Sequence, residues 1–429
     1  MQGKFRWFIL TLIFIATCIN YLDRQIIGLL KPLLEKEFNW TEQHFSRIVM
    51  AFTAAYAIGL LLAGNIIDKI GTKAGYLISI IIWSMAGMVH ALARSVNGFI
   101  FARIGLGVGE AGNFPAGVKA IAEWFPKQER GLATGIFNAG TSVGVVMAVF
   151  LVPAILHIGS WKEVFWITGG LGFIWLIFWI FFYNTPEKSK YLTKDEYNFI
   201  KAGQGLVPAE QSTEKLNLFK FFHHKQTWAY ITGKALIDPI FWFFLFWLPS
   251  YFASSFSLDL KKPSWELMII YTATTIGSIG GGYLSSLLIK RGWATIKARK
   301  FVLMLFAFTE LTVILTQYAH AAWFAVLLLS IAVAVHQAWA TNIFTLASDL
   351  FPKEAVATVV GIGGMAGAVG GILFPLFVGK LLDRFKELGN ITDGYNILFT
   401  ICGCTYLIAY LIIHLLTRKA EMVPLNKLS

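Results

Sequence analysis

The sequence predicts an all-α membrane protein with twelve transmembrane helices in two groups of six. The 429-residue chain is 56% hydrophobic and only 14% charged, with a mean hydropathy of +0.64, which is too apolar for a soluble domain. Apolar runs of about 18 or more residues, each long enough to span a bilayer, recur along nearly the whole chain. A polar segment over residues 184–226 divides these runs into two sets.

The predicted spans are distributed equally on either side of that polar segment. A helix needs roughly 20 apolar residues to cross the hydrocarbon core, and each run meets this length. Trp161 and Trp323 fall near the ends of spans, where amphipathic rings favour the interface. The spans cover residues 6–27, 47–67, 75–95, 98–120, 131–156, 161–183, 227–252, 265–289, 298–318, 321–348, 355–383 and 394–417.

The polar segment is predicted to be a linker between two bundles. It is rich in Lys, Glu and Gln, contains Pro186 and Pro208, and includes a predicted short surface helix at "TKDEYNFIKAG". The expected domain organisation is an N-terminal six-helix bundle over 1–183, a cytoplasmic linker over 184–226 and a C-terminal six-helix bundle over 227–429.

The net charge of +12 is explained by the positive-inside rule better than by nucleic-acid binding. With the N-terminus inside, 22 of the 36 Lys and Arg residues lie in cytoplasmic segments and ten in outer loops. The excess places both termini in the cytoplasm. The other four, Arg24, Arg103, Lys119 and Lys234, lie within predicted spans.

No sequence feature indicates an enzyme, a cofactor or a metal site. Cys18, Cys402 and Cys404 lie in apolar spans and form neither a disulfide framework nor a spaced metal site. The chain contains no G-x-x-x-x-G-K-[ST] phosphate loop and no set of nucleophile and base. The first apolar run is too long for a typical signal-peptide core, so we expect no cleavable signal peptide.

The two halves resemble each other. "EWFPKQERGLATG" at 123–135 aligns with "DLFPKEAVATVVG" at 349–361, and "GNIIDKIGTK" at 64–73 aligns with "GYLSSLLIKRGW" at 282–293. This spacing predicts parallel repeats related by an axis along the membrane normal, with a binding site at the midplane between the halves.

The segment "GNIIDKIGTK" resembles the signature loop between the second and third helices of the major facilitator superfamily. Asp68 and Lys69 match the usual acid and base, and Gly71 and Lys73 continue the pattern. The resemblance covers the whole chain. It implies the major facilitator fold, in which this loop locks and releases the cytoplasmic side during rocking.

A narrower resemblance is carried by longer stretches. "NYLDR", "RIGLGVGEAGNFPAGVKAIAEWFP" and "GIFNAGTSVG" resemble the anion:cation symporter branch, while "GKALIDPIFWFFLFWLP" and "HQAWATNIFTLASDLFP" resemble its hexuronate-transporter group. This implies a proton-coupled importer of glucuronate, galacturonate or a close sugar acid in the bacterial cytoplasmic (inner) membrane. We expect it to act as a monomer in the lipid bilayer, with no nucleic-acid partner.

Four charged residues in the first half are candidates for the functional site, because charges inside a membrane are costly and need a partner or a role. Arg24 lies near the outer end of its predicted span, and Arg103 lies near the start of its own. Glu110 follows Arg103 by two helical turns on the same face. With Asp23, these residues are predicted to share one cavity. The alternative is a static network of ion pairs.

The resemblance assigns roles to these four residues. It implies that Asp23 and Glu110 form the proton-coupling pair, that Arg24 holds the substrate carboxylate and that Arg103 is the ion-pair partner of Glu110. An Arg presents a fork suited to a carboxylate, which agrees with the second of these roles.

Further polar and aromatic residues are candidates for contact with the substrate, although each has a plain structural alternative. Lys234 and Asp238 are spaced i, i+4 and are predicted to be ion-pair partners that either neutralise each other or face the pocket. His336 occupies the position equivalent to Glu110 in the second repeat. The substrate-binding candidates besides Arg24 are Tyr21, Tyr56, Asn138, Trp242, His336, Gln337 and Asn342.

Two other functions are compatible with these observations. One is transport of another organic anion in the same fold, such as an aldonate or sialic acid, by symport or exchange. The other is a membrane sensor built on a transporter scaffold.

Overall fold

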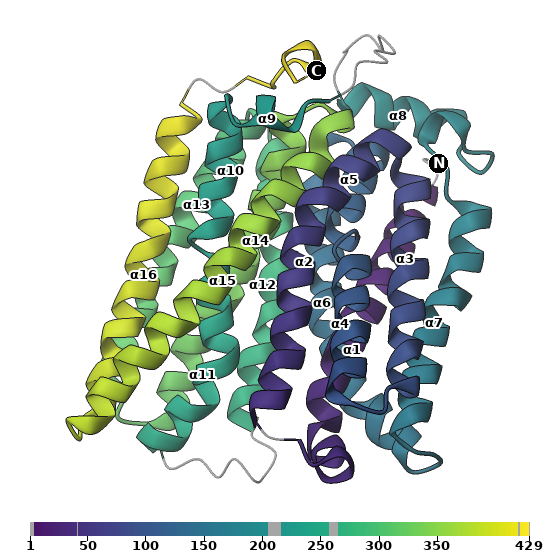
Figure 1. Ribbon diagram of the computed structural model, residues 1–429. Helices are drawn as coiled ribbons and strands as arrows, with labels where there is room; N and C mark the ends of the chain where they lie inside the picture. Colours follow the sequence, from purple (N-terminus) through teal and green to yellow (C-terminus); the bar gives the residue numbers. More distant parts are fainter. Residues whose placement is uncertain (1–3, 41, 205–215, 257–264, 419–420, 429) are drawn as a thin grey trace.

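The computed structural model describes residues 4–40, 42–204, 216–256, 265–418 and 421–428. Within this part of the chain all regular structure is helical, and the long helices stand side by side in two bundles (Figure 1). The predicted all-α fold of two six-helix bundles is confirmed. Both chain ends lie at the same end of the bundles, which we call the terminal face (Figure 1).

The helices of the first bundle and the linker follow in chain order. The first bundle contains α1 (Phe5–Phe38), α2 (Glu42–Ile70), α3 (Thr72–Val89), η1 (His90–Leu92), α4 (Val96–Glu110), α5 (Asn113–Trp124), α6 (Lys127–Leu156) and α7 (Trp161–Phe182). The linker contains η2 (Pro186–Lys188), α8 (Lys194–Gln204) and α9 (Leu218–Phe221). α8 confirms the short helix predicted at "TKDEYNFIKAG".

The second bundle is completed by the C-terminal tail. It contains α10 (Lys225–Ala235), α11 (Asp238–Phe256), α12 (Trp265–Lys290), α13 (Thr295–Glu310), η3 (Leu311–Tyr318), α14 (Ala322–Leu350), η4 (Lys353–Ala355), α15 (Val356–Glu387), α16 (Ile391–Leu416) and η5 (Leu425–Lys427).

Eleven helical segments of the described chain are long and apolar enough to cross a membrane. The twelfth predicted span, 98–120, was expected to be one helix and is instead two, α4 and α5, separated by a turn at Ala111 and Gly112. Pro115 explains the break, because it has no N–H to donate to the carbonyl of Ala111.

The predicted span 227–252 is also divided. α10 ends at Ala235 and α11 begins at Asp238. Pro239 has no N–H to donate to the carbonyl of Ala235, four residues earlier. The same hydrogen bond is missing between Pro115 and Ala111. Yet Pro153 and Pro375 lie inside continuous helices, so the sequence alone does not tell which prolines interrupt a span.

The bundles pack closely through α2 against α15 and α6 against α12. A Cβ on Gly64 would lie 2.2 Å from the carbonyl oxygen of Ala357, and a Cβ on Gly282 would lie 2.0 Å from that of Gly131. In the repeat alignment Gly64 corresponds to Gly282 and Gly131 to Ala357. The two contacts are therefore images of each other, as expected for parallel repeats.

The linker helix α8 attaches to both bundles at the terminal face. Arg6 of α1 donates to Glu129 of α6 at 2.9 Å and to Glu196 of α8 at 2.8 Å. At the other end of α8, Gln204 accepts a hydrogen bond from Lys353 of η4 at 2.5 Å. These contacts hold α8 against α1 of the first bundle and η4 of the second.

Candidate functional site

Arg24 of α1 and Glu110 of α4 form an ion pair inside the first bundle. Nη2 and Nε of Arg24 donate to Oε2 of Glu110 at 2.8 and 3.0 Å. Glu110 is the last residue of α4, so the break before α5 places its side chain at a helix end. Its Oε1 is buried and accepts no hydrogen bond. A second carboxylate would have to displace Glu110 to bind the same edge of the guanidinium, where Nε and Nη2 donate.

Three aromatic rings surround the guanidinium of Arg24. Its central carbon lies 4.6 Å from the ring centroid of Tyr21, 5.0 Å from that of Phe52 and 4.5 Å from that of Tyr56. Tyr21 and Tyr56 were predicted as partners of the substrate, whereas Phe52 was missed. Phe52 lies one helical turn before Tyr56 and stacks on it at 5.8 Å. The rings fix the orientation of the guanidinium through cation–π contacts.

Asp23 lies next to Arg24 in sequence but is not paired with it. Asp23 is 3% exposed, and its carboxylate accepts no hydrogen bond. Thr168 of α7 approaches it, but the hydroxyl does not reach hydrogen-bonding geometry. Because an unpaired carboxylate anion is costly in an apolar interior, we expect Asp23 to carry a proton in this arrangement.

Arg103 is not the direct partner of Glu110 that was predicted. Its Nε and Nη2 are buried without hydrogen-bond partners, and its guanidinium lies 5.5 Å from the ring centroid of Phe52. Side chains on a helix point toward its N-terminus, so Arg103 projects away from Glu110, which lies two turns later. Arg24 reaches Glu110 from a different helix and forms the ion pair instead.

The second bundle contributes another ion pair near the break between α10 and α11. Lys234 Nζ lies 2.7 Å from Asp238 Oδ2, as the i, i+4 spacing predicts. The ammonium also lies 4.3 Å from the ring centroid of Phe344 in α14. Each bundle therefore places one ion pair beside a broken helix, and broken helices often form the binding sites of transporters.

Asn138 and Gln337 join the bundles at the middle of the protein. Asn138 of α6 donates to Gln337 of α14 at 2.7 Å and to Ser278 of α12 at 3.0 Å. Both residues were predicted as substrate ligands. In this arrangement they bind each other, so a substrate would compete with that hydrogen bond.

The remaining predicted ligands of the second bundle differ in their availability. Asn342 donates to the carbonyls of Gly281 and Ala338, so the structure uses its amide in helix packing. His336 shares a 2.7 Å hydrogen bond with the hydroxyl of Tyr406. Trp242 stacks on Phe246 and faces α15, where a Cβ on Gly371 would lie 2.8 Å from its ring.

The predicted gating loop lies at the terminal face and connects the two bundles. Asp68 of α2 accepts hydrogen bonds from the backbone N–H groups of Thr358 at 2.6 Å and Ala357 at 3.3 Å, in the first turn of α15. A carboxylate is stabilised at this end of a helix. Its ion-pair partner is Lys119 at 2.7 Å, whereas the side chain of Lys69, the other charged residue of the predicted loop motif, is exposed.

The other residues of the predicted loop stabilise its turn. Gly71 has φ +85°, a left-handed conformation that favours glycine, and it precedes the first residue of α3. Lys73 donates to Asn184 at 3.1 Å. The second repeat has a neutral counterpart of the Asp68 contact, in which Ser286 accepts from the backbone N–H of Leu132 at 3.1 Å.

A second charged contact at the terminal face was not predicted. Asp349 of α14 binds Arg130 of α6 at 3.2 Å and Arg299 of α13 at 3.1 Å, and all three side chains are buried. The signal available in the sequence was the position of Asp349 and Arg130 beside the repeated "FPK" segments. Together with Asp68, this contact closes the terminal face between the bundles.

Substitution of Asp68 by Asn is expected to open the terminal face. The change keeps the shape of the side chain but leaves Lys119 buried without its counter-ion. Breaking such a pair costs about 3–5 kcal/mol. In a variant with Leu60→Cys, made in a background without the native cysteines, we expect faster thiol labelling when Asp68→Asn is added. Asp195→Asn on the exposed surface of α8 is the matched control. An unchanged labelling rate would show that Asp68 does not hold this face closed.

The sequence profile of the Major Facilitator Superfamily matches residues 13–375. The chain belongs to this superfamily. It is therefore an integral, multi-pass membrane transporter and not an enzyme.

Two relatives and one solved structure illustrate its place among Major Facilitator Superfamily proteins. The "Hexuronate transporter" of Escherichia coli (strain K12) is 33% identical, over 95% of this chain and 93% of its own. The "Galacturonate transporter" of Dickeya chrysanthemi is also 33% identical, over 66% of this chain and 83% of its own. The proton:xylose symporter XylE has 16% identity and a TM-score of 0.70, over 96% of this chain and 95% of its own, which supports the fold alone. The predicted resemblance to hexuronate transporters is confirmed.

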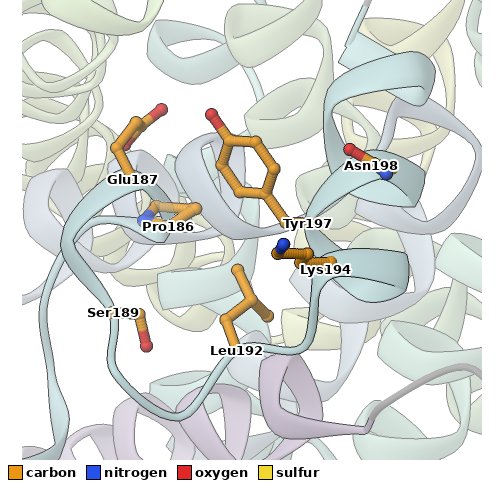
Figure 2. A pocket seen from close by; sticks show the side chains of 7 residues that line it. All are labelled: Pro186, Glu187, Ser189, Leu192, Lys194, Tyr197 and Asn198. Atoms are coloured by element: carbon orange, nitrogen blue, oxygen red, sulfur yellow. The ribbon is translucent and has the colours of Figure 1, made fainter.

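A surface hollow at the linker is lined by none of the candidate site residues described above. Figure 2 shows that it is formed by η2, α8 and the segment between them. Partial burial opposes ionisation of Glu187 there, but its ion pair with Lys201 holds the pKa of this carboxyl below its ordinary value. The residues that line the hollow are Pro186, Glu187, Ser189, Leu192, Lys194, Tyr197 and Asn198.

Proposed function

We propose that this protein is a proton-coupled secondary transporter that imports a hexuronate or a related sugar acid by alternating access. The observation that carries the proposal is the occupied fork of Arg24. Its Nε and Nη2 both donate to Glu110 in a buried setting. These are the two parallel donors that a substrate carboxylate would use.

Competition for Arg24 explains how a proton and an anion are transported together. When Glu110 is ionised it holds Arg24, and a substrate carboxylate would meet both a blocked fork and a like charge. A proton on Glu110 removes that charge and weakens its hold on the guanidinium. The substrate carboxylate then takes two charge-assisted hydrogen bonds from Arg24. Asp23, which has no hydrogen-bond partner, is the second proposed proton carrier.

The proposed orientation follows from the distribution of positive charge, which places both termini in the cytoplasm of a bacterial inner membrane. The terminal face is then the cytoplasmic face, closed by the contacts of Asp68 and Asp349. On this proposal substrate enters from the opposite side. Release requires these contacts to break as the bundles rock about the site. All residues proposed to act in this cycle belong to one chain, so on this proposal the protein works as a monomer.

The names of the relatives support the substrate class. Relatives at 33% identity are named for hexuronate and galacturonate, and one at 28% identity over 89% of this chain is named for D-galactonate. All three names denote monocarboxylate sugar acids. An aldonate is therefore the second candidate, favoured by the D-galactonate relative.

Uptake into proteoliposomes tests the proposal. Labelled glucuronate, galacturonate and galactonate are supplied with and without an inward proton gradient. We expect one of the two uronates to accumulate above its external concentration only with the gradient. Accumulation of galactonate alone would favour the second candidate. Equal accumulation without a gradient would contradict proton coupling, and no uptake of any of the three acids would contradict the substrate class.

A further inference from the structure

We propose that Asp238 determines how many negative charges the site accepts. Paired with Lys234, it restricts the site to sugar acids with a single carboxylate, and without its charge the same site accepts sugar diacids. The inference rests on the proposed function, because it concerns which sugar acids are transported.

The pair of Lys234 and Asp238 is built into the end of a broken helix. Lys234 lies in the last turn of α10, and Asp238 is the first residue of α11. The side chains are 8% and 22% exposed, so Asp238 is the more accessible member of the pair. A break in a spanning helix frees backbone and side-chain groups to face a ligand, which is how many transporters form their sites.

A row of aromatic rings connects this pair to Arg24 in the other bundle. The ring of Tyr21, which contacts Arg24, lies 6.4 Å from that of Phe114. Phe114 of α5 stacks across the bundle interface on Phe344 at 5.2 Å, and Lys234 lies over Phe344. The two cations thus stand at opposite ends of one aromatic row, which is suited to the apolar faces of a sugar.

Asp238 packs against α15, the helix that meets α2 of the first bundle. A Cβ on Gly367 of α15 would lie 2.3 Å from Oδ2 of Asp238. The backbone of α15 therefore packs directly against this carboxylate, while the side chain of Asp238 stays 22% exposed.

Charge balance shows what the two ion pairs select. Once Glu110 is protonated, the Nε and Nη2 donors of Arg24 are released, and together they match one carboxylate. Lys234 and Asp238 are neutral as a pair, and they offer both donors and acceptors to hydroxyl groups at the far end of the sugar. A second carboxylate at that end would meet no net positive charge and would be repelled by Asp238.

Neutralising Asp238 changes that balance. Asp238→Asn leaves Lys234 as a second uncompensated cation at the far end of the row. A charge-assisted hydrogen bond changes affinity by about 10- to 150-fold. We therefore expect the affinity for a hexarate, the diacid of the same sugar, to rise by about that factor relative to the affinity for the hexuronate.

The experiment measures competition of unlabelled hexarate and hexuronate against labelled hexuronate in counterflow, which needs no proton gradient. The variants are Asp238→Asn, Lys234→Gln and the double variant with both changes, which is again neutral. We expect a shift toward the hexarate in Asp238→Asn only, and the wild-type preference for the hexuronate in Lys234→Gln and in the double variant.

The outcomes separate this inference from the proposed function. A wild-type protein that exchanges neither acid would contradict the proposed function. A wild type that exchanges the hexuronate, with the same preference in Asp238→Asn, would overturn the inference alone. If Asp238→Asn does not fold, Asp238→Ser decides, because it removes the same negative charge in a smaller side chain. Exclusion of the hexarate by Asp238→Ser, as in the wild type, would then overturn the inference.

Discussion

Glu110→Gln is expected to abolish uphill uptake of the substrate and to leave counterflow intact. Gln keeps the shape of Glu110 but carries neither the charge that holds Arg24 nor the proton that releases it. The guanidinium is then available to the substrate at every pH. The variant should therefore bind and exchange the sugar acid but gain nothing from a proton gradient. The measurement is accumulation of labelled uronate in proteoliposomes with and without that gradient, beside exchange at equal concentrations.

Asp23→Asn is expected to give the same separation of uphill uptake from exchange, because Asp23 is the other proposed proton carrier. Glu310→Gln is the matched control. Glu310 is also a buried carboxyl without hydrogen-bond partners, but it lies in α13 of the second bundle, outside the proposed proton pathway. The control should keep uphill uptake. If both site variants still concentrate the substrate with the gradient, the proposed coupling residues are wrong.

Arg24→Lys is expected to weaken substrate binding by about 10- to 150-fold. Lys keeps the positive charge but presents a single ammonium group in place of the two parallel donors of the guanidinium. Loss of one charge-assisted hydrogen bond corresponds to this change in affinity. The cage of Tyr21, Phe52 and Tyr56 is also shaped for a planar group. Calorimetric titration of the purified variant with the transported uronate measures the change.

Two comparisons isolate the role of the fork in that experiment. The neutral amide of the same sugar acid should lose much less affinity than the acid, because it offers no carboxylate to the guanidinium. Arg103→Lys is the matched protein control, since Arg103 is buried nearby but bonded to no carboxylate. Wild-type affinity of Arg24→Lys for the uronate would leave Arg24 as a structural counter-ion of Glu110 alone.

The sequence by itself determined the fold class and the elements that carry the site. Apolar runs separated by one polar linker predicted the two bundles, because only helices satisfy their backbone groups within a bilayer. The cost of charge in that environment singled out Arg24, Glu110, Lys234 and Asp238. For Lys234 and Asp238, the i, i+4 spacing also predicted the partner correctly, although the break between α10 and α11 lies between the two residues.

Only the tertiary structure decided which distant groups meet. Arg24 and Glu110 come from separate helices, and which of two arginines reaches Glu110 depends on side-chain direction and helix packing, which a sequence spacing does not contain. Lys119, whose partner the sequence did not indicate, pairs with Asp68 for the same reason. Pro115 and Pro239 interrupt their spans while other prolines do not, because tertiary packing determines whether a helix with a missing hydrogen bond stays continuous.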